Sequence, residues 1–250
     1  MIGVVLGGGG GRAGRVACPR VQRAFVDRVT RLAGWLRRSH RVAVPSHRPV
    51  KVNLGSSLLV AEGWVNVDGA LSALVASWPT PALRLFYRLA GIRAHLSEAE
   101  YIAVLKRNRF VHHNLEYGIP LPDSSADYAF ASHFLEHLSK GHGERLVRET
   151  LRVLRPGGVV RIAIPDLAVF IDAFSDGRKE EAMDGVFEDW ELGHFARHRY
   201  MYDFEMLAGL LGRAGFTDVR RCEYREGRVP DLEELDNRPG SLVVEAAKPG

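Results

Sequence analysis

Residues 126–166 read ADYAFASHFLEHLSKGHGERLVRETLRVLRPGGVVRIAIPD, and this stretch decides the fold of the 250-residue chain. A short apolar run leads into a polar turn with two histidines and a glutamate. A charged helix, a Pro-Gly-Gly corner and a β-branched run ending on Asp166 follow. Apolar runs of this length are typical of strands covered on both faces. The stretch predicts a strand–helix–strand unit whose reactive side chains lie at the carboxyl end of its first strand, where ligands bind in open α/β sheets.

The composition is that of an ordinary globular protein, with 46% hydrophobic and 26% charged residues. One α/β domain is consistent with this length. No apolar run approaches the roughly 18 residues of a membrane span. Cys18 and Cys222 lie far apart and lack a metal-binding spacing, so we expect a reducing, cytoplasmic compartment.

The net charge of +4 is unevenly distributed. Residues 1–50 hold ten arginines and one acidic residue, whereas the other 200 residues hold 24 basic and 29 acidic ones. A basic segment could contact nucleic acid or an anionic membrane, but terminal segments are more often solvated leaders. We therefore expect a flexible basic leader at 1–20, a single domain at 21–250, and an acceptor other than nucleic acid. The apolar spacing of Val21–Arg38 predicts an entry helix.

Two further strands are expected upstream. Lys51–Gly55 indicates a buried strand that ends on a glycine, and Gly63–Asp68 a second strand that ends on an acid. A glycine lets a ligand approach the backbone, and an acid can accept hydrogen bonds from ribose hydroxyls. A turn glycine and a helix cap would explain the same residues. Only twelve residues separate Gly55 from Asp68, so the first crossover must be short or irregular.

Taken in this order, the segments resemble class I S-adenosylmethionine-dependent methyltransferases, in particular a bacterial subgroup linked to polysaccharide and glycoside biosynthesis. The resemblance implies a Rossmann-like α/β fold: a seven-stranded, mostly parallel sheet with helices on both faces and an antiparallel last strand. Thr217–Cys222 and Ser241–Ala247 would be the terminal strands. The matching segments are KVNLGSS (51–57), GWVNVDG (63–69), RFVHHNLEYGIPLPDSSADYAFASHFLEHL (109–138), RVLRPGGVVRIAIPDL (152–167), AGF (214–216) and SLVVEA (241–246).

The resemblance implies S-adenosylmethionine as cofactor. By position, Gly55 would pass under its methionine part and Asp68 would hold its ribose. Asn114 and Leu115, at the end of an expected strand Arg109–Leu115, would flank the adenine, with an amide where an acid is common. The cofactor-binding residues implied in this way are Asn53, Gly55, Ser56, Asp68, Asn114, Leu115 and Ser132.

His133, Glu136 and His137 form the motif H-x-x-E-H and are the candidate catalytic residues. A hydroxyl acceptor needs a base or a metal ion. In one interpretation His133 or His137 is the general base. In a second, His133, Glu136 and His137 bind a divalent metal completed by His194 or His198; in a third, the residues are structural.

The same motif is the zinc signature of one metalloprotease class. It follows a strand here and is not embedded in a long helix, which favours the methyltransferase.

Residues 69–108 form an insertion that could serve as an acceptor lid, a homodimer surface or extra core. Within it, Ser97–Lys106 begins with a capping-box pattern. The aromatic and basic segment Gly193–Asp203 suits a sugar-like or anionic acceptor. We expect O-methylation of a saccharide, oligosaccharide or glycosylated metabolite. N- or C-methylation of another small molecule, and a non-catalytic cofactor-binding scaffold, are the alternatives.

Overall fold

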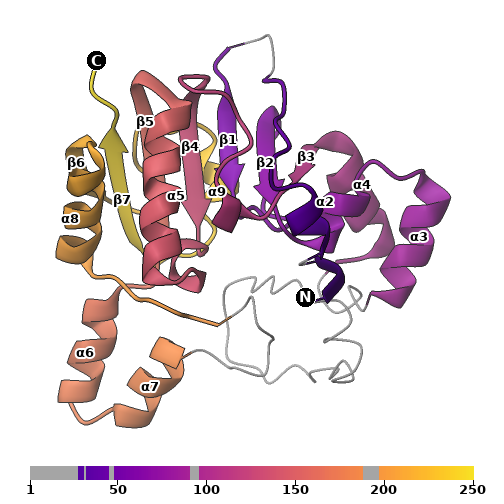
Figure 1. The fold of residues 1–250 in the computed structure, drawn as a ribbon. Coiled ribbons are helices and arrows are strands. Elements are labelled where there is room, and N and C mark those ends of the chain that lie inside the picture. Colours follow the sequence, from indigo (N-terminus) through magenta and orange to yellow (C-terminus); the bar gives the residue numbers. More distant parts are fainter. Residues whose placement is uncertain (1–27, 31, 45–47, 91–95, 188–196) are drawn as a thin grey trace.

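Seven strands form one sheet in the order β3-β2-β1-β4-β5-β7-β6 (Figure 1). Neighbouring strands pair in parallel except for β7, which is antiparallel to both β5 and β6. The computed structural model describes residues 28–30, 32–44, 48–90, 96–187 and 197–250. The strands are β1 (Lys51–Leu54), β2 (Trp64–Asp68), β3 (Arg109–His112), β4 (Ala126–Ser132), β5 (Leu154–Ile164), β6 (Thr217–Cys222) and β7 (Leu242–Ala247). The predicted Rossmann-like α/β fold is confirmed.

Helices connect the strands and cover the sheet. The α-helices are α2 (Leu71–Val75), α3 (Thr80–Leu89), α4 (Glu98–Arg107), α5 (Lys140–Val153), α6 (Leu167–Ser175), α7 (Lys179–Phe187), α8 (Phe204–Ala214) and α9 (Leu232–Leu235). The 3-10 helices are η2 (Leu115–Tyr117) and η3 (Leu135–His137). In Figure 1, α5 and α8 lie in front of the sheet, and α9 lies behind it.

The first face of the sheet carries the main core. Leu146 and Val147 of α5 and Leu207 and Leu211 of α8 are buried there against the strands. In α8 these residues are four positions apart, and in α5 buried Thr150 and Val153 follow at a spacing of three to four residues, so the buried residues lie on one side of each helix. Burying such a side chain contributes roughly 2–3 kcal/mol. Apolar packing therefore holds this face and, with it, the strand ends that carry the site.

The second face contains buried polar groups. Arg161 of β5 is fully buried and forms ion pairs with Asp236 and Glu245. Its guanidinium also donates to the backbone carbonyls of Glu223 and Glu226. A loop covers this part of the sheet, and its buried carbonyls need donors. Arg161 meets that need and fastens the loop to β5.

Two local boundaries differ from the sequence prediction. The third strand ends at His112, because the Asn114 side chain accepts from the Glu116 amide and starts η2 instead. The strand β5 begins before the Pro-Gly-Gly segment, 156–158, whose Gly157 has φ +77°. That segment is an irregularity within the strand, with a register shift against β4, not a corner before it. The first crossover is irregular, as predicted, with no helix between β1 and β2.

The N-terminal part of the chain lies mostly outside the described residues, including the expected leader at 1–20. Residues 28–30 and 32–36 are helical, within the predicted entry helix. No helix among the described residues is both long enough and apolar enough to span a bilayer.

The helices of the insertion, residues 69–108, lie beside β3 (Figure 1), and they have a small hydrophobic core. Its buried side chains include Leu83 of α3 and Tyr101 and Leu105 of α4. The predicted capping box is present, since Ser97 and Glu100 exchange hydrogen bonds at the start of α4. A lid or dimer role for the insertion stays a prediction.

Candidate active site

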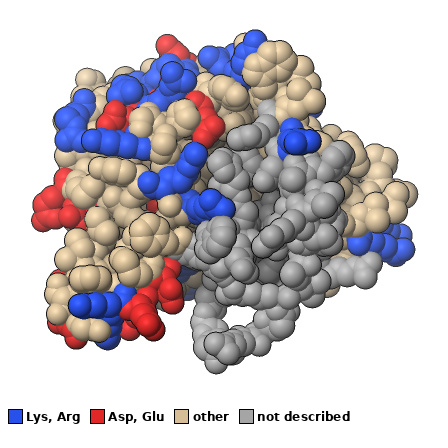
Figure 2. Space-filling view, turned by 60° about the horizontal axis from the view of Figure 1, so that its bottom comes forward, with Lys and Arg blue, Asp and Glu red and all other residues tan. Residues whose placement is uncertain are grey.

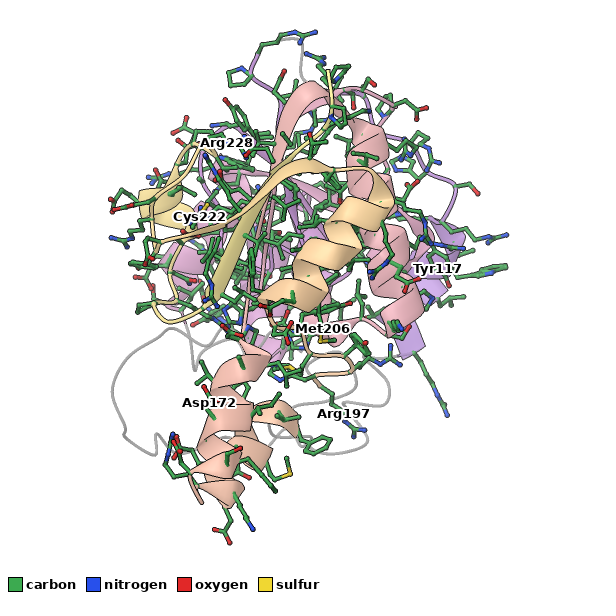
Figure 3. All side chains as sticks on the ribbon, turned by 90° about the vertical axis from the view of Figure 1, so that its left-hand side faces the viewer. Tyr117, Asp172, Arg197, Met206, Cys222 and Arg228 are labelled. Carbon is green, nitrogen blue, oxygen red and sulfur yellow. The ribbon has the colours of Figure 1, made fainter. Side chains whose placement is uncertain are left out.

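The carboxyl ends of the parallel strands meet at the edge of the sheet from which α5 and α6 start (Figure 1). This edge comes forward in Figure 2, where Lys and Arg side chains, with some Asp and Glu, gather beside the grey residues. The helices α6 and α7 project beyond it as a hairpin, with Asp172 on α6 in Figure 3. The site is built from this edge.

Gly55 occupies a turn that only glycine accommodates well. Its φ is +69°, and a Cβ at this position would lie 2.2 Å from the Phe134 ring. Its amide donates to the Val67 carbonyl at 2.9 Å. The turn after β1 is therefore held closely against the turn after β4, and the two turns form one wall of the edge. Phe134 was not among the site residues predicted from sequence.

Asp68 joins the turns that follow β1 and β2. One of its carboxylate oxygens accepts from the Ser57 amide at 2.7 Å, and the other from the Ala70 amide at 2.6 Å. Burial raises the pKa of Asp68, and these two hydrogen bonds partly oppose that rise. These two hydrogen bonds fix the direction of the carboxylate at the strand end.

The other predicted cofactor residues lie at different depths. Asn53 is buried in the sheet, where its Nδ2 donates to the Leu59 carbonyl and to Asn66. Ser56 and Leu115 are also buried, and Ser132 lies at the end of β4. Asn114 caps η2. A Cβ on Gly34 would lie 3.0 Å from the Asn114 Cβ, so the N-terminal helical residues pack beside the expected adenine position.

His133 stands directly after β4 in a left-handed conformation, with φ +48°. Its Nδ1 lies 3.3 Å from Glu136 Oε1, and its Nε2 lies 2.8 Å from Ser241 Oγ. Non-glycine residues rarely adopt this backbone conformation, and strain of this kind concentrates at functional sites. The imidazole is thus held between a carboxylate and a hydroxyl.

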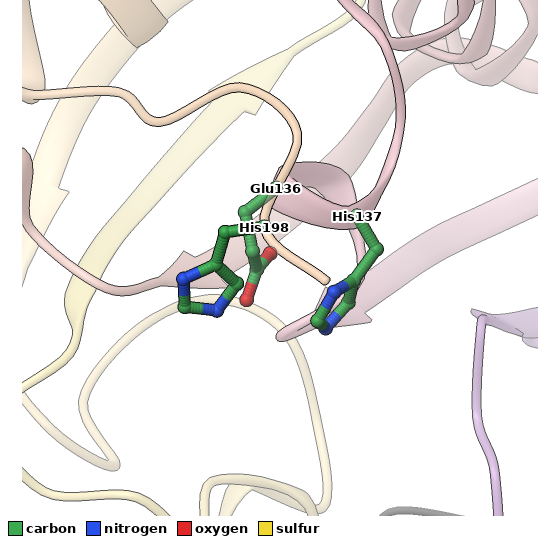
Figure 4. Close-up of side chains that lie close together, drawn as sticks. All are labelled: Glu136, His137 and His198. Atoms are coloured by element: carbon green, nitrogen blue, oxygen red, sulfur yellow. The ribbon is translucent and has the colours of Figure 1, made fainter. Parts of the chain in front are cut away.

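Glu136 is 1% exposed and lies between two histidines of its own turn. Burial alone would raise its pKa, but the His133 and His137 contacts outweigh burial and lower it. His198 also approaches this carboxylate, so the structure brings Glu136, His137 and His198 together (Figure 4). His194 lies outside the described residues.

A cavity of about 440 Å³ opens beside His133. Its wall includes Asp166, which caps α6 and pairs with Arg221. The lining residues are His133, Pro165, Asp166, Val169, Phe170, Asn237, Arg238, Pro239, Gly240 and Ser241. The sequence prediction placed the acceptor at 193–203. Residues 237–241 could have been found from topology, because an antiparallel β7 must start at the edge where β5 ends.

The described end of the expected acceptor segment packs against the edge. The backbone amides of Arg199 and Tyr200 donate to the Glu136 carbonyl at 2.7 and 3.2 Å. Tyr202 is buried, and its backbone forms an isolated parallel β-bridge with that of Asp166. This segment therefore packs against the turn that contains Glu136, whereas the cavity is lined by the loop that precedes β7.

Known methyltransferases match part of this chain. A family model described as "methyltransferase domain" matches residues 75–162. A probable S-adenosylmethionine-dependent methyltransferase of Mycobacterium tuberculosis is 33% identical over 128 residues, covering 51% of this chain and 39% of that protein. One of Mycolicibacterium smegmatis is 32% identical over 144 residues, covering 56% of this chain and 48% of that protein. The chain thus matches less than half the length of these relatives.

A solved structure, a possible histamine N-methyltransferase of Thermotoga maritima, aligns over 91% of this chain and 95% of its own, with 19% identity and a TM-score of 0.45. The sequence matches support the enzyme class and cofactor predicted above, a methyltransferase that uses S-adenosylmethionine. Their printed names give no acceptor. The activity and substrates of the whole protein are therefore proposals.

Proposed function

We propose that the protein is an S-adenosylmethionine-dependent O-methyltransferase whose acceptor is a hydroxyl of a saccharide or glycosylated metabolite. The observation that carries this proposal is the position of His133, between the Glu136 carboxylate and the cavity. An imidazole oriented by a carboxylate is a recurrent general base. A neutral hydroxyl is a weak nucleophile and needs such a base, whereas a neutral amine nitrogen can accept a methyl group without first losing a proton.

The residues at the strand ends are consistent with the cofactor. Gly55 has the conformation expected beneath a ligand, and Asp68 is a directed carboxylate. We propose that Asp68 accepts from the ribose hydroxyls and that Asn114 lies beside the adenine. When bound, S-adenosylmethionine supplies the activated methyl group that the acceptor oxygen takes up.

His133 would handle the proton of the reaction. Its Nε2 contacts Ser241 Oγ at 2.8 Å on the cavity wall, and an acceptor hydroxyl could take the place of that serine hydroxyl. The imidazole would then take the proton of the acceptor hydroxyl, and the oxygen could bond to the methyl group as the bond between that group and the cofactor sulfur breaks. Glu136 holds the ring and stabilises the charge that the ring acquires. Asp166 and Arg238 offer polar groups for neighbouring hydroxyls of the acceptor.

Two measurements test this function. Calorimetric titration with S-adenosylhomocysteine should show one binding site per chain. Transfer of a radiolabelled methyl group from S-adenosylmethionine should then be measured across a panel of sugars, glycosides and glycosylated small molecules. Alkali-stable labelling of a hydroxyl-bearing glycoside supports the proposal. Transfer confined to amines or carbon acceptors contradicts the O-methylation, and absence of cofactor binding contradicts the whole proposal in favour of a scaffold.

A further inference from the structure

The side chains of Glu136, His137 and His198 converge on one another (Figure 4). Each offers one ligand atom, and these atoms lie within 4.8 Å of one another. Among the residues that the structure describes, these three side chains form the one group of acidic, histidine and cysteine residues that lie close enough together to hold a metal ion. Glu136 and His137 belong to η3, and His198 comes from the segment that leads to α8.

The Glu136 carboxylate is buried, but its oxygens lack hydrogen-bond donors among the described residues. It is 1% exposed, and neither oxygen receives a hydrogen bond of good geometry from a described residue. Its ion-pair contact with His133 Nδ1, at 3.3 Å, involves Oε1. A buried carboxylate is costly unless paired or bound to a metal. The second oxygen, Oε2, is therefore suited to a cation.

Both histidines have a tautomer suited to metal binding. His137 Nδ1 lies 3.1 Å from the Arg197 carbonyl, and His198 Nδ1 lies 3.2 Å from the carbonyls of Gly185 and Val186, at the end of α7. A carbonyl only accepts, so each Nδ1 donates its proton. The lone pair of each neutral ring is then on Nε2. Metal-binding histidines commonly show this arrangement, with the second ring nitrogen bonded to a carbonyl.

We propose that Glu136, His137 and His198 bind a divalent transition-metal ion such as Zn²⁺. Two imidazoles and one carboxylate suit zinc better than magnesium, and three protein ligands leave a position open for water or substrate. Ligand atoms on a tetrahedral zinc ion lie about 3.4 Å apart, so small side-chain rotations must draw these three together. The proposal goes beyond methyl transfer, since it concerns ion binding alone.

This ligand set differs from the one predicted from sequence, because His133 is not a member. Its two ring nitrogens face Glu136 and Ser241. The ion would join η3 to the segment before α8, and it would leave Glu136 Oε1 in contact with His133. The structure thus assigns the two histidines of H-x-x-E-H to different tasks.

The test uses the full chain, freed of metal with a chelator and dialysed. Calorimetric titration with zinc chloride and elemental analysis after desalting should both give one zinc ion per chain. His137→Ala, His198→Ala and Glu136→Gln should each weaken binding by at least about tenfold. His133→Ala should weaken binding less than these three variants, since His133 contacts the ligand Glu136 and is not itself a ligand. His142→Ala is the matched control. His142 Nδ1 lies 3.3 Å from Glu116 Oε1, as His133 Nδ1 does from Glu136, but no third metal ligand joins that pair among the described residues.

Two outcomes overturn the proposal. One is the absence of stoichiometric zinc binding by the unaltered chain; the other is binding that survives both His137→Ala and His198→Ala. If a variant fails to fold, cobalt can replace zinc in the unaltered chain. Strong visible absorption of a four- or five-coordinate ion is expected, and the weak absorption of a hexa-aqua-like ion contradicts the site. Neither readout depends on methyl transfer.

Discussion

Two buried glutamates in this protein have opposite surroundings. Glu245 of β7 is fully buried, and both of its oxygens receive donors: the Arg228 and Val229 amides, and the side chains of Arg161, Arg220 and Arg228. Glu136 is equally buried, but no described group donates to it with good hydrogen-bond geometry. A saturated carboxylate stabilises the fold, whereas an unsaturated one can still accept a proton donor or a cation.

The two sites also lie at different places on the sheet. The Glu245 network fastens a loop across the second face, away from the strand ends. Glu136 lies at the carboxyl edge, in the first turn after β4. The comparison suggests that this protein separates charges that hold the fold from charges that act on ligands. Substitutions in the Glu245 network should change stability, whereas substitutions at the carboxyl edge should change ligand binding or turnover.

The largest effect is expected from His133→Ala, which removes the proposed base beside Glu136. Methyl transfer to the acceptor found with the panel should fall about 10²- to 10⁴-fold, the range for loss of a general base. Affinity for S-adenosylhomocysteine, measured by calorimetry, should be retained. His142→Ala should keep full turnover. Turnover unchanged in His133→Ala would make that histidine structural.

Arg161→Met tests the buried ion-pair network that includes Glu245. It leaves Asp236 and Glu245 without their shared buried partner, so the free energy of unfolding should fall by about 3–5 kcal/mol. Urea denaturation measures this change. Arg178→Met, which removes exposed ion pairs, should cost less than about 1 kcal/mol. Equal losses of unfolding free energy in the two variants would show that the buried Arg161 ion pairs stabilise the fold no more than exposed ones do.

His113 at the end of β3 should make the fold sensitive to acid. Burial, followed by the nearby Arg41, lowers its pKa to about 4. The folded chain then keeps His113 neutral while the unfolded chain takes up a proton below its ordinary pKa of about 6.5. Stability should therefore fall as the pH drops from about 6.5 towards 4, by on the order of 2 kcal/mol at pH 5 from this group. His113→Asn should flatten this dependence in urea unfolding at pH 7 and pH 5, and an unchanged slope would contradict it.

The smallest effect is expected at the cofactor end. Asp68→Asn keeps one acceptor oxygen for the neighbouring amides but loses the charge, and charged acceptors form hydrogen bonds about twice as strong as neutral ones. Affinity for S-adenosylhomocysteine should fall roughly five- to tenfold by calorimetry. Asp172→Asn, on exposed α6, should bind normally. No change in Asp68→Asn would remove Asp68 from the cofactor site.

The fold was predictable because its signals are local. The apolar runs of β4 and β5, the glycine after β1 and the acid at the end of β2 each mark an element within a few residues. The antiparallel last strand followed from the family resemblance. The end of β3 was predicted wrongly, since the sequence pattern does not reveal that Asn114 caps η2.

The site was less predictable because it depends on distant contacts. The spacing of H-x-x-E-H suggested that its three side chains act together. The structure keeps His133 and His137 beside Glu136, and it adds two partners that are distant in the chain: Ser241 beside His133, and His198 beside Glu136 and His137. Ser241 and Phe134 are ordinary residues in the sequence, and only the start of β7 and the turn at Gly55 bring them to the edge.

The distinction between the two glutamates can be measured most directly with matched variants, Glu136→Gln and Glu245→Gln, unfolded in urea with a chelator present. We predict that Glu245→Gln loses about 3–5 kcal/mol of unfolding free energy, because its saturated ion pairs are broken. Glu136→Gln should lose clearly less, since the contacts with His133 and His137 that keep the pKa of Glu136 low are fewer than the contacts that Glu245 makes. A loss in Glu136→Gln as large as in Glu245→Gln would show that Glu136 serves the fold and would contradict its assignment to the active site.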